Sequence, residues 1–153
     1  FFQISFNNFP FQIFVLMIFI QIIMGAFVSG LDAGQIYQTW PLMGNSFLPN
    51  DLIFENLNDL FELDNRSLVQ FYHRVFAYVI IIYSFFLVIF IYKNKFNELY
   101  KALIIVLLFL FLQAILGVLT LISGLNIYLA SFHQITSVLL IFSALNLYYL
   151  RAK

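Results

Sequence analysis

Four long runs of apolar residues dominate this sequence of 153 residues. A helix needs about 20 residues to cross the hydrocarbon core of a bilayer, which is about 30 Å thick. The runs are continuous and not alternating, which favours helices over the strands of a membrane barrel. They cover residues 11–30, 68–92, 99–122 and 127–150. The sequence therefore predicts an all-α integral membrane protein, a bundle of four transmembrane helices in a single membrane domain over residues 1–153.

The composition agrees with a chain that is embedded in lipid. Hydrophobic residues make up 63% of the sequence and charged residues only 9%, whereas charged residues make up about 25% of an ordinary soluble domain. The net charge of zero gives no electrostatic attraction to nucleic acid, so the expected partner is the lipid bilayer. The absence of cysteine excludes disulfides, iron–sulfur clusters and covalent haem attachment.

Basic residues indicate how the chain crosses the membrane. They flank the connection between the second and third runs, and they follow the fourth run: Lys93, Lys95, Lys101, Arg151 and Lys153. The positive-inside rule places these residues, and the C-terminus, on the cytoplasmic or matrix side. The long connection over residues 31–67 then lies outside, with Tyr37 and Trp40 near the outer interface.

This outer connection is acidic. It carries six carboxylates, Asp32, Asp51, Glu55, Asp59, Glu62 and Asp64. Acidic and apolar residues interleave over residues 51–63, which suits a short amphipathic helix on the membrane surface. A solvated loop fits the same periodicity equally well.

A short pattern occurs twice. Gln21 and Gly25 in the first run match Gln113 and Gly117 in the third, and each pair is followed by Ser-Gly-Leu-Asp or Ser-Gly-Leu-Asn. A span with one histidine comes next in both cases. The pattern predicts two repeated helix hairpins, although small residues that favour any close helix contact would explain it equally.

The two histidines of the chain, His73 and His133, both lie inside predicted spans. Each is five or six residues below the outer end of its helix, a depth of about 8–9 Å at about 1.5 Å per residue. Two imidazoles at one depth are too few for a closed zinc site but suffice as the two axial ligands of a haem iron. We therefore expect a bis-His b-type haem, with structural hydrogen bonding or a proton path as the alternatives.

Polar neighbours of the histidines are further candidates for the site. Arg74 would pair with a haem propionate, or reach the outer surface or an acidic residue of the loop. Gln70 would bond to the haem or the backbone, or cap its helix. Three polar residues follow His133 and would either orient its ring or form polar contacts between helices: Gln134, Thr136 and Ser137. No catalytic constellation is visible, because no carboxylate lies inside a span.

The sequence resembles the haem A synthase family, in its mitochondrial and alphaproteobacterial form. The resemblance runs from about residue 21 to residue 150. It rests on the segment Gly25–Gly34 with Tyr37, Trp40-Pro41 and Met43-Gly44, on Gln70–Arg74, on Leu112–Gly117 and on His133-Gln134.

The resemblance implies an eight-span protein in two similar halves, each with a pair of histidines. The amino-terminal half would hold the substrate haem O, and the carboxy-terminal half a haem b cofactor. In the substrate half of the family a Glu stands three residues before the first histidine, and here that position is Gln70. The chain therefore resembles the carboxy-terminal cofactor half, with His73 and His133 as axial ligands of haem b. Its first residue is Phe1 and not Met, so we expect a fragment or a processed product.

The family reaction oxidises the C8 methyl group of haem O to a formyl group, which gives haem A. The haem b of this half would relay electrons, and the half alone would bind haem without completing the reaction. Expected partners are haem O synthase, an electron acceptor and a second copy of the chain, in a bacterial plasma membrane or the mitochondrial inner membrane. Alternatives are a stand-alone bis-His b-type membrane cytochrome that transfers electrons, or a haem-free anchor or transporter fragment.

Overall fold

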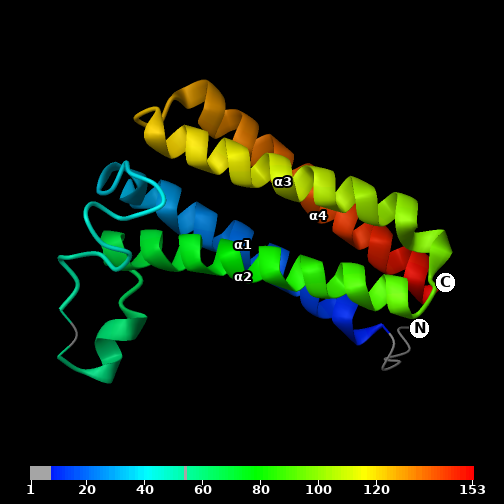
Figure 1. Ribbon diagram of the computed structural model, residues 1–153. Helices are drawn as coiled ribbons and strands as arrows, with labels where there is room; N and C mark the ends of the chain where they lie inside the picture. Colours follow the sequence, from blue (N-terminus) through cyan, green and yellow to red (C-terminus); the bar gives the residue numbers. More distant parts are fainter. Residues whose placement is uncertain (1–7, 54) are drawn as a thin grey trace.

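Four long helices form the protein, as the sequence predicts. The computed structural model describes residues 8–53 and 55–153. In this part of the chain, four helices are long and apolar enough to cross a membrane, and each end lies within two residues of its predicted position. They are α1 (Phe9–Gly30), α2 (Arg66–Lys93), α3 (Tyr100–Ile122) and α4 (Ile127–Ala152) (Figure 1). Three short 3₁₀ helices join them: η1 (Ala33–Gln35), η2 (Leu57–Phe61) and η3 (Asn97–Leu99).

Local sequence signals explain where the helices begin. Pro10 occupies the first turn of α1, where its missing N–H group costs nothing. Asn65 caps α2, because its side-chain oxygen accepts a hydrogen bond from the N–H group of Leu68 at 3.2 Å. Asn126 caps α4 through the N–H groups of Tyr128 and Leu129. These caps fix the start of both histidine-bearing helices.

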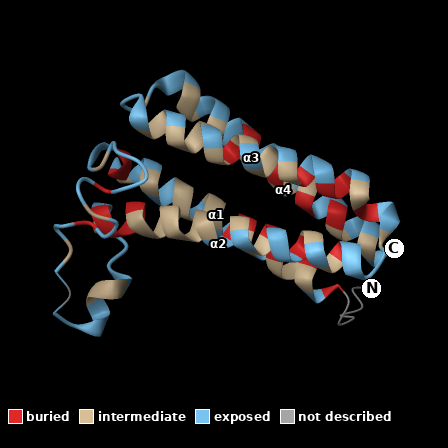
Figure 2. Ribbon diagram, viewed as in Figure 1, coloured by how far each residue is buried: buried red, intermediate tan, exposed pale blue. Residues whose placement is uncertain are grey.

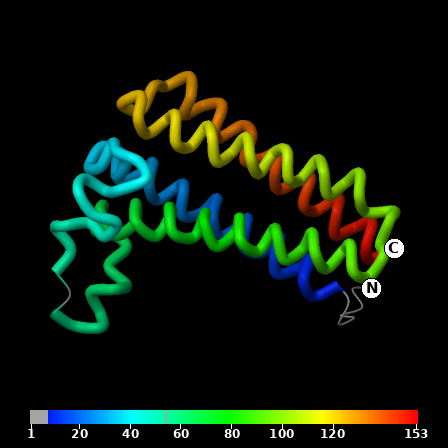
Figure 3. Tube along the Cα trace, viewed as in Figure 1, coloured from blue at the N-terminus to red at the C-terminus, as the bar shows by residue number. Residues whose placement is uncertain are grey.

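The helices pair as two antiparallel hairpins. Helix α1 packs along α2, helix α3 packs along α4, and α1 also contacts α4. Both termini of the described chain lie at one end of the bundle, here called the terminal end (Figure 1). The long loop after α1 and the turn between α3 and α4 lie at the opposite end, here called the loop end. The hairpins approach each other at the terminal end and diverge toward the loop end (Figure 3).

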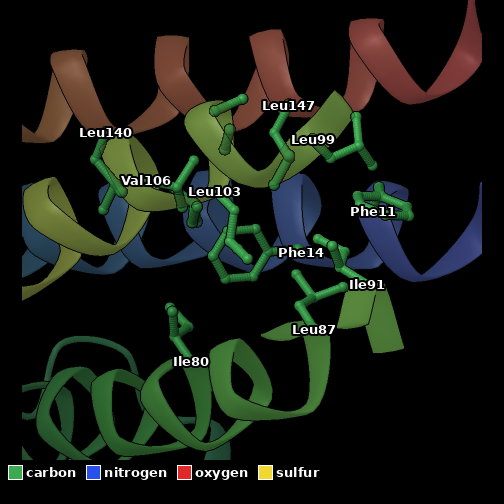
Figure 4. Close-up of a cluster of buried hydrophobic side chains, with 13 residues drawn as sticks. Phe11, Phe14, Ile80, Leu87, Ile91, Leu99, Leu103, Val106, Leu140 and Leu147 are labelled. Carbon is green, nitrogen blue, oxygen red and sulfur yellow. The ribbon is translucent and has the colours of Figure 1, made fainter. Parts of the chain in front are cut away.

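The apolar core occupies only the terminal half of the bundle. Side chains from all four helices meet there (Figure 4), and Figure 2 shows buried positions gathered along these helix segments. Phe14 stacks on Tyr83 with ring centroids 6.1 Å apart. The buried members of this core are Phe11, Phe14, Ile18, Ile80, Leu87, Ile91, Leu99, Ala102, Leu103, Val106, Leu140, Ala144 and Leu147. Among the described residues, the cluster does not continue to the level of the histidines.

The acidic loop does not form the amphipathic α-helix that residues 51–63 suggest. Only η2 is helical there, and Phe54 lies outside the described residues. The carboxylate of Asp59 accepts hydrogen bonds from the N–H groups of Glu55 and Asn56 at 2.7 and 2.9 Å. These local bonds start a 3₁₀ turn at Asn56 and compete with a longer helix. The loop interpretation of this segment is therefore the right one.

The two Ser-Gly-Leu segments of the predicted repeat differ in backbone conformation. Gly30 is the last residue of α1, and no atom lies near the position of a β-carbon there. Gly124 follows the end of α3 with a φ of +71°, and Leu125 follows it with a φ of +61°. The repeated hairpin thus remains a prediction, and its Ser-Gly-Leu part has no common structure.

Replacing Phe14 with Ala tests the packing at the terminal end. Phe14 is only 1% exposed, whereas Phe19 on the same helix is 53% exposed. We expect Phe14→Ala to lower the free energy of unfolding by about 3–5 kcal/mol, because it leaves a cavity. Phe19→Ala should change it by less than about 0.5 kcal/mol. Equal losses in denaturant unfolding of the two variants in lipid would contradict the assignment of the core.

Candidate functional site

The two histidines lie near the starts of α2 and α4, at the loop end of the bundle where the hairpins diverge. Both side chains are half-buried. The Nδ1 atom of His73 and the Nδ1 atom of His133 are both buried without a hydrogen-bond partner. A buried polar atom without a partner is uncommon and costly. Each ring therefore carries a nitrogen that is suited to a ligand from outside the chain.

Each histidine meets a glutamine and a glycine of the preceding helix. The Nε2 atom of Gln21 donates a hydrogen bond to the backbone oxygen of His73 at 3.0 Å. Gln113 donates in the same way to the backbone oxygen of His133 at 2.7 Å. One turn further along these helices, Gly25 lies against the ring of His73, and Gly117 lies against the ring of His133. The two hairpins therefore hold their histidines through the same pair of contacts.

Gln70 and Arg74 hold the outer loop. The backbone oxygen of Tyr37 accepts a hydrogen bond from Gln70 at 2.9 Å and another from Arg74 at 2.8 Å. Arg74 also donates to the backbone oxygens of Thr39, at 2.9 Å, and Leu42, at 3.4 Å. Gln70 thus bonds to the backbone, which is one of its expected partners, and its bond to a haem stays a prediction. The partners of Arg74 are loop carbonyls and not an acidic side chain, and its pairing with a propionate stays a prediction.

Asp51 fastens the same loop to the start of α2. Its two carboxylate oxygens accept hydrogen bonds from the hydroxyl groups of Tyr37 and Ser67, both at 2.6 Å. Burial alone would raise the pKa of Asp51, but the hydrogen bonds from Ser67 and Tyr37 outweigh it and hold the pKa below its usual value. The neighbouring carboxylate raises the pKa of the Tyr37 hydroxyl. We call Tyr37, Asp51 and Ser67 the loop latch.

Of the three polar residues after His133, only Thr136 joins two helices. Thr136 is buried; its hydroxyl accepts a hydrogen bond from Gln113 and donates one to Phe132. Ser137 donates to the backbone oxygen of Gln134 at 2.6 Å, and the side chain of Gln134 is exposed. The helix-joining interpretation therefore holds for Thr136.

No sequence pattern predicts the loop latch. Its members are 14 and 16 residues apart along the chain, and no periodicity connects them. No sequence pattern predicts a role for Phe47 either. Its ring contacts the rings of Phe71 and Tyr78, with centroid distances of 6.0 and 6.5 Å. Contacts of this kind depend on the path of an irregular loop, which hydropathy does not encode.

The donor set fits a group that brings most of its own ligands. Within residues 8–53 and 55–153, no three His, Cys, Asp or Glu side chains lie close enough together to hold a metal ion. A bare ion held by these histidines would lack the four ligands of a closed zinc site. A haem iron already has four macrocycle nitrogens and needs two more donors. The two unpartnered imidazole nitrogens match that requirement.

Comparison with known proteins places the chain in a family. The model of the COX15-CtaA family, described as cytochrome oxidase assembly protein, matches residues 8–145. The chain belongs to the COX15-CtaA family. The match covers all four helices of this family member except the last turns of α4.

Several curated relatives of this COX15-CtaA protein carry the name heme A synthase. The protein from Pelagibacter ubique is 43% identical over 142 residues, which is 90% of this chain and 41% of the relative. The protein from Wolbachia pipientis is 44% identical over 133 residues, 87% of this chain and 36% of the relative. The protein from Rickettsia prowazekii is 35% identical over 127 residues, which is 83% of this chain and 38% of the relative.

The chain therefore spans about two fifths of the length of the curated relatives that it matches. The comparison with solved structures found no significant match.

The loop latch should open in acid. Because the pKa of Asp51 is lowered in the folded chain, its contribution is present at neutral pH and is lost as the pH falls through that lowered value, below about 4. Trp40, the single tryptophan of the chain, lies in the latched loop and reports the change. We expect a step in its emission below pH 4 that Asp51→Ala abolishes. An identical step in both proteins would contradict the latch.

Proposed function

We propose that this chain is the haem b half of a haem A synthase, which oxidises the C8 methyl group of haem O to a formyl group. The observation that carries the proposal is the pair of buried, unpartnered imidazole nitrogens of His73 and His133. The names of the relatives support the reaction, because several of them are called heme A synthase. On this proposal the chain is part of an oxidoreductase.

His73 and His133 would hold the haem by supplying one nitrogen ligand each from the two hairpins. When bound, haem b supplies the reversible uptake of one electron at its iron. Apolar side chains of the four spans exclude water from the neighbourhood of the rings. Gln70 and Arg74 keep the outer loop folded over the start of α2 through the backbone oxygen of Tyr37. The N–H groups of Arg74 that the loop leaves free are suited to a propionate carboxylate.

Three features support the assignment to the cofactor half. The position three residues before His73 is Gln70, where the substrate half of the family carries a Glu. The chain covers only about two fifths of its relatives, which leaves room for a second half that holds haem O. No carboxylate lies in any of the four long helices α1, α2, α3 and α4. Haem O synthase and an electron acceptor are the partners that this assignment implies.

The location of the protein follows from the same proposal. The four apolar helices would cross a bacterial plasma membrane or the mitochondrial inner membrane. Lysine and arginine lie at the terminal end, after α4 and between α2 and α3. The positive-inside rule therefore orients this end toward the cytoplasm or matrix, with the acidic loop on the other side.

Removing either histidine tests the proposal directly. We expect the purified chain to show the reduced α band of six-coordinate haem b. His73→Ala and His133→Ala should each lose low-spin haem, because one axial ligand is missing. Gln134→Ala is the matched control, since Gln134 is next to His133 but its side chain is exposed. Gln134→Ala should keep the low-spin haem spectrum, with at most a small shift of the bands.

Two results would contradict the proposal. The first is that the wild-type chain binds no iron protoporphyrin IX in the absorption experiment. The second is that both histidine variants keep the low-spin spectrum of the wild-type chain, which would show that other groups ligate the iron.

A further inference from the structure

We propose that the Gln-x-x-x-Gly segments of α1 and α3 position the two histidine rings for ligation. Gln21 and Gln113 fix the backbone of the histidines, and Gly25 and Gly117 leave the space that sets the orientation of each ring. These four are positioning residues, because they act through His73 and His133 and not on the iron. The inference rests on the proposed function, since it concerns how the rings meet a haem.

The glutamines act on the helix backbone. A helical carbonyl oxygen uses one lone pair for its intrahelical bond and keeps the second free. The amide of Gln21 occupies that second position on His73 at 3.0 Å, and the amide of Gln113 does so on His133 at 2.7 Å. No water competes for this bond inside a bilayer. Each glutamine therefore fixes the height and rotation of its histidine within the hairpin.

The glycines act on the rings. A β-carbon on Gly25 would lie 3.3 Å from Cε1 of His73, and a β-carbon on Gly117 would lie 3.1 Å from Cε1 of His133. Both distances are shorter than ordinary van der Waals contact, which covers 3.4–4 Å. An alanine at either glycine would therefore require the ring to shift by a few tenths of an ångström. The position of each ring therefore depends on glycine, which has no β-carbon, at position 25 or 117.

Helix direction explains why the glutamine precedes the glycine. Carbonyl groups of a helix point toward its C-terminus, and side chains lean toward its N-terminus. In the antiparallel pair α1 and α2, the carbonyl of His73 therefore faces the terminal end and its ring faces the loop end. Helix α1 runs toward the loop end, so it reaches the carbonyl first and the ring four residues later, about 6 Å further on.

The same order in α3 and α4 gives the second set of contacts. A general preference of helix contacts for small residues explains the glycines but not a glutamine one turn before each of them. The combined motif is therefore specific to the histidines.

The two sets of contacts are unequal in strength. Gln113 also donates to the hydroxyl of Thr136, on the same helix as His133. The Oε1 atom of Gln21 is buried without a partner. In addition, Gly117 approaches its ring more closely than Gly25 does. The orientation of His133 should therefore be the more sensitive of the two.

A haem-free experiment tests the contacts themselves. The chain has two histidines, so the chain with ¹⁵N-labelled histidine gives two sets of imidazole signals by NMR in lipid nanodiscs. Gly25→Ala should move the signals of His73, and Gly117→Ala should move those of His133 by more. Gly30→Ala is the matched control, because no atom lies within 4 Å of its added carbon, and it should move neither.

A haem experiment tests the link to ligation. We expect Gln21→Leu and Gln113→Leu to bind added iron protoporphyrin IX about tenfold more weakly than wild type. The largest g value of the low-spin ferric signal should also shift, because it depends on ring orientation. Gln12→Leu is the control: its amide bonds to the hydroxyl of Tyr148 at 2.8 Å, at the terminal end. This variant should match the wild type in affinity and g value.

The outcomes separate the inference from the proposed function. If the glycine variants leave both imidazole signals in place, or the glutamine variants bind haem like Gln12→Leu, the inference is wrong. If the wild-type chain binds no haem while the imidazole signals move as expected, the proposed function fails and the contacts stand. Should Gly117→Ala fail to fold, Gln113→Leu tests the same hairpin, because it removes a bond without adding a clash.

Discussion

Inside a bilayer a polar atom has to find its partner within the protein, and the Nδ1 atom of each imidazole ring lacks one. The backbone of each span satisfies itself as a helix. Gln21 and Gln113 direct their amides to histidine carbonyls. What remains is one buried nitrogen on each of two rings, at the loop end of both hairpins. In a chain with so few charges, this pair of nitrogens is the observation on which the proposed haem rests.

The apolar core and the two histidines occupy different halves of the bundle. The apolar cluster holds the hairpins together at the terminal end, where Phe14 and Tyr83 stack. Toward the loop end the hairpins diverge, and the contacts become polar and specific. The loop latch and Arg74 then close the irregular segment over the start of α2. This division separates the packed half of the bundle from the half that carries the two histidines.

The sequence predicted the spans well and the loop poorly, for a physical reason. Continuous hydropathy fixes a membrane helix to within a turn, because charged residues and caps such as Asn65 and Asn126 mark its ends. The histidines stood out since ionisable residues are rare in spans. The segment 51–63 left helix and loop open, because its apolar spacing resembles a helix face while the side chain of Asp59 satisfies the backbone locally. A backbone partner was expected for Gln70, but which carbonyl groups Gln70 and Arg74 meet could not be predicted, since that depends on where an irregular loop returns to α2.

The central claim is that one imidazole from each hairpin ligates a single iron. Pulsed EPR measures it most directly, on the chain with ¹⁵N-labelled histidine and bound ferric iron protoporphyrin IX. The account predicts hyperfine couplings from two histidine nitrogens to one low-spin iron. Coupling to one histidine nitrogen or to none would contradict it.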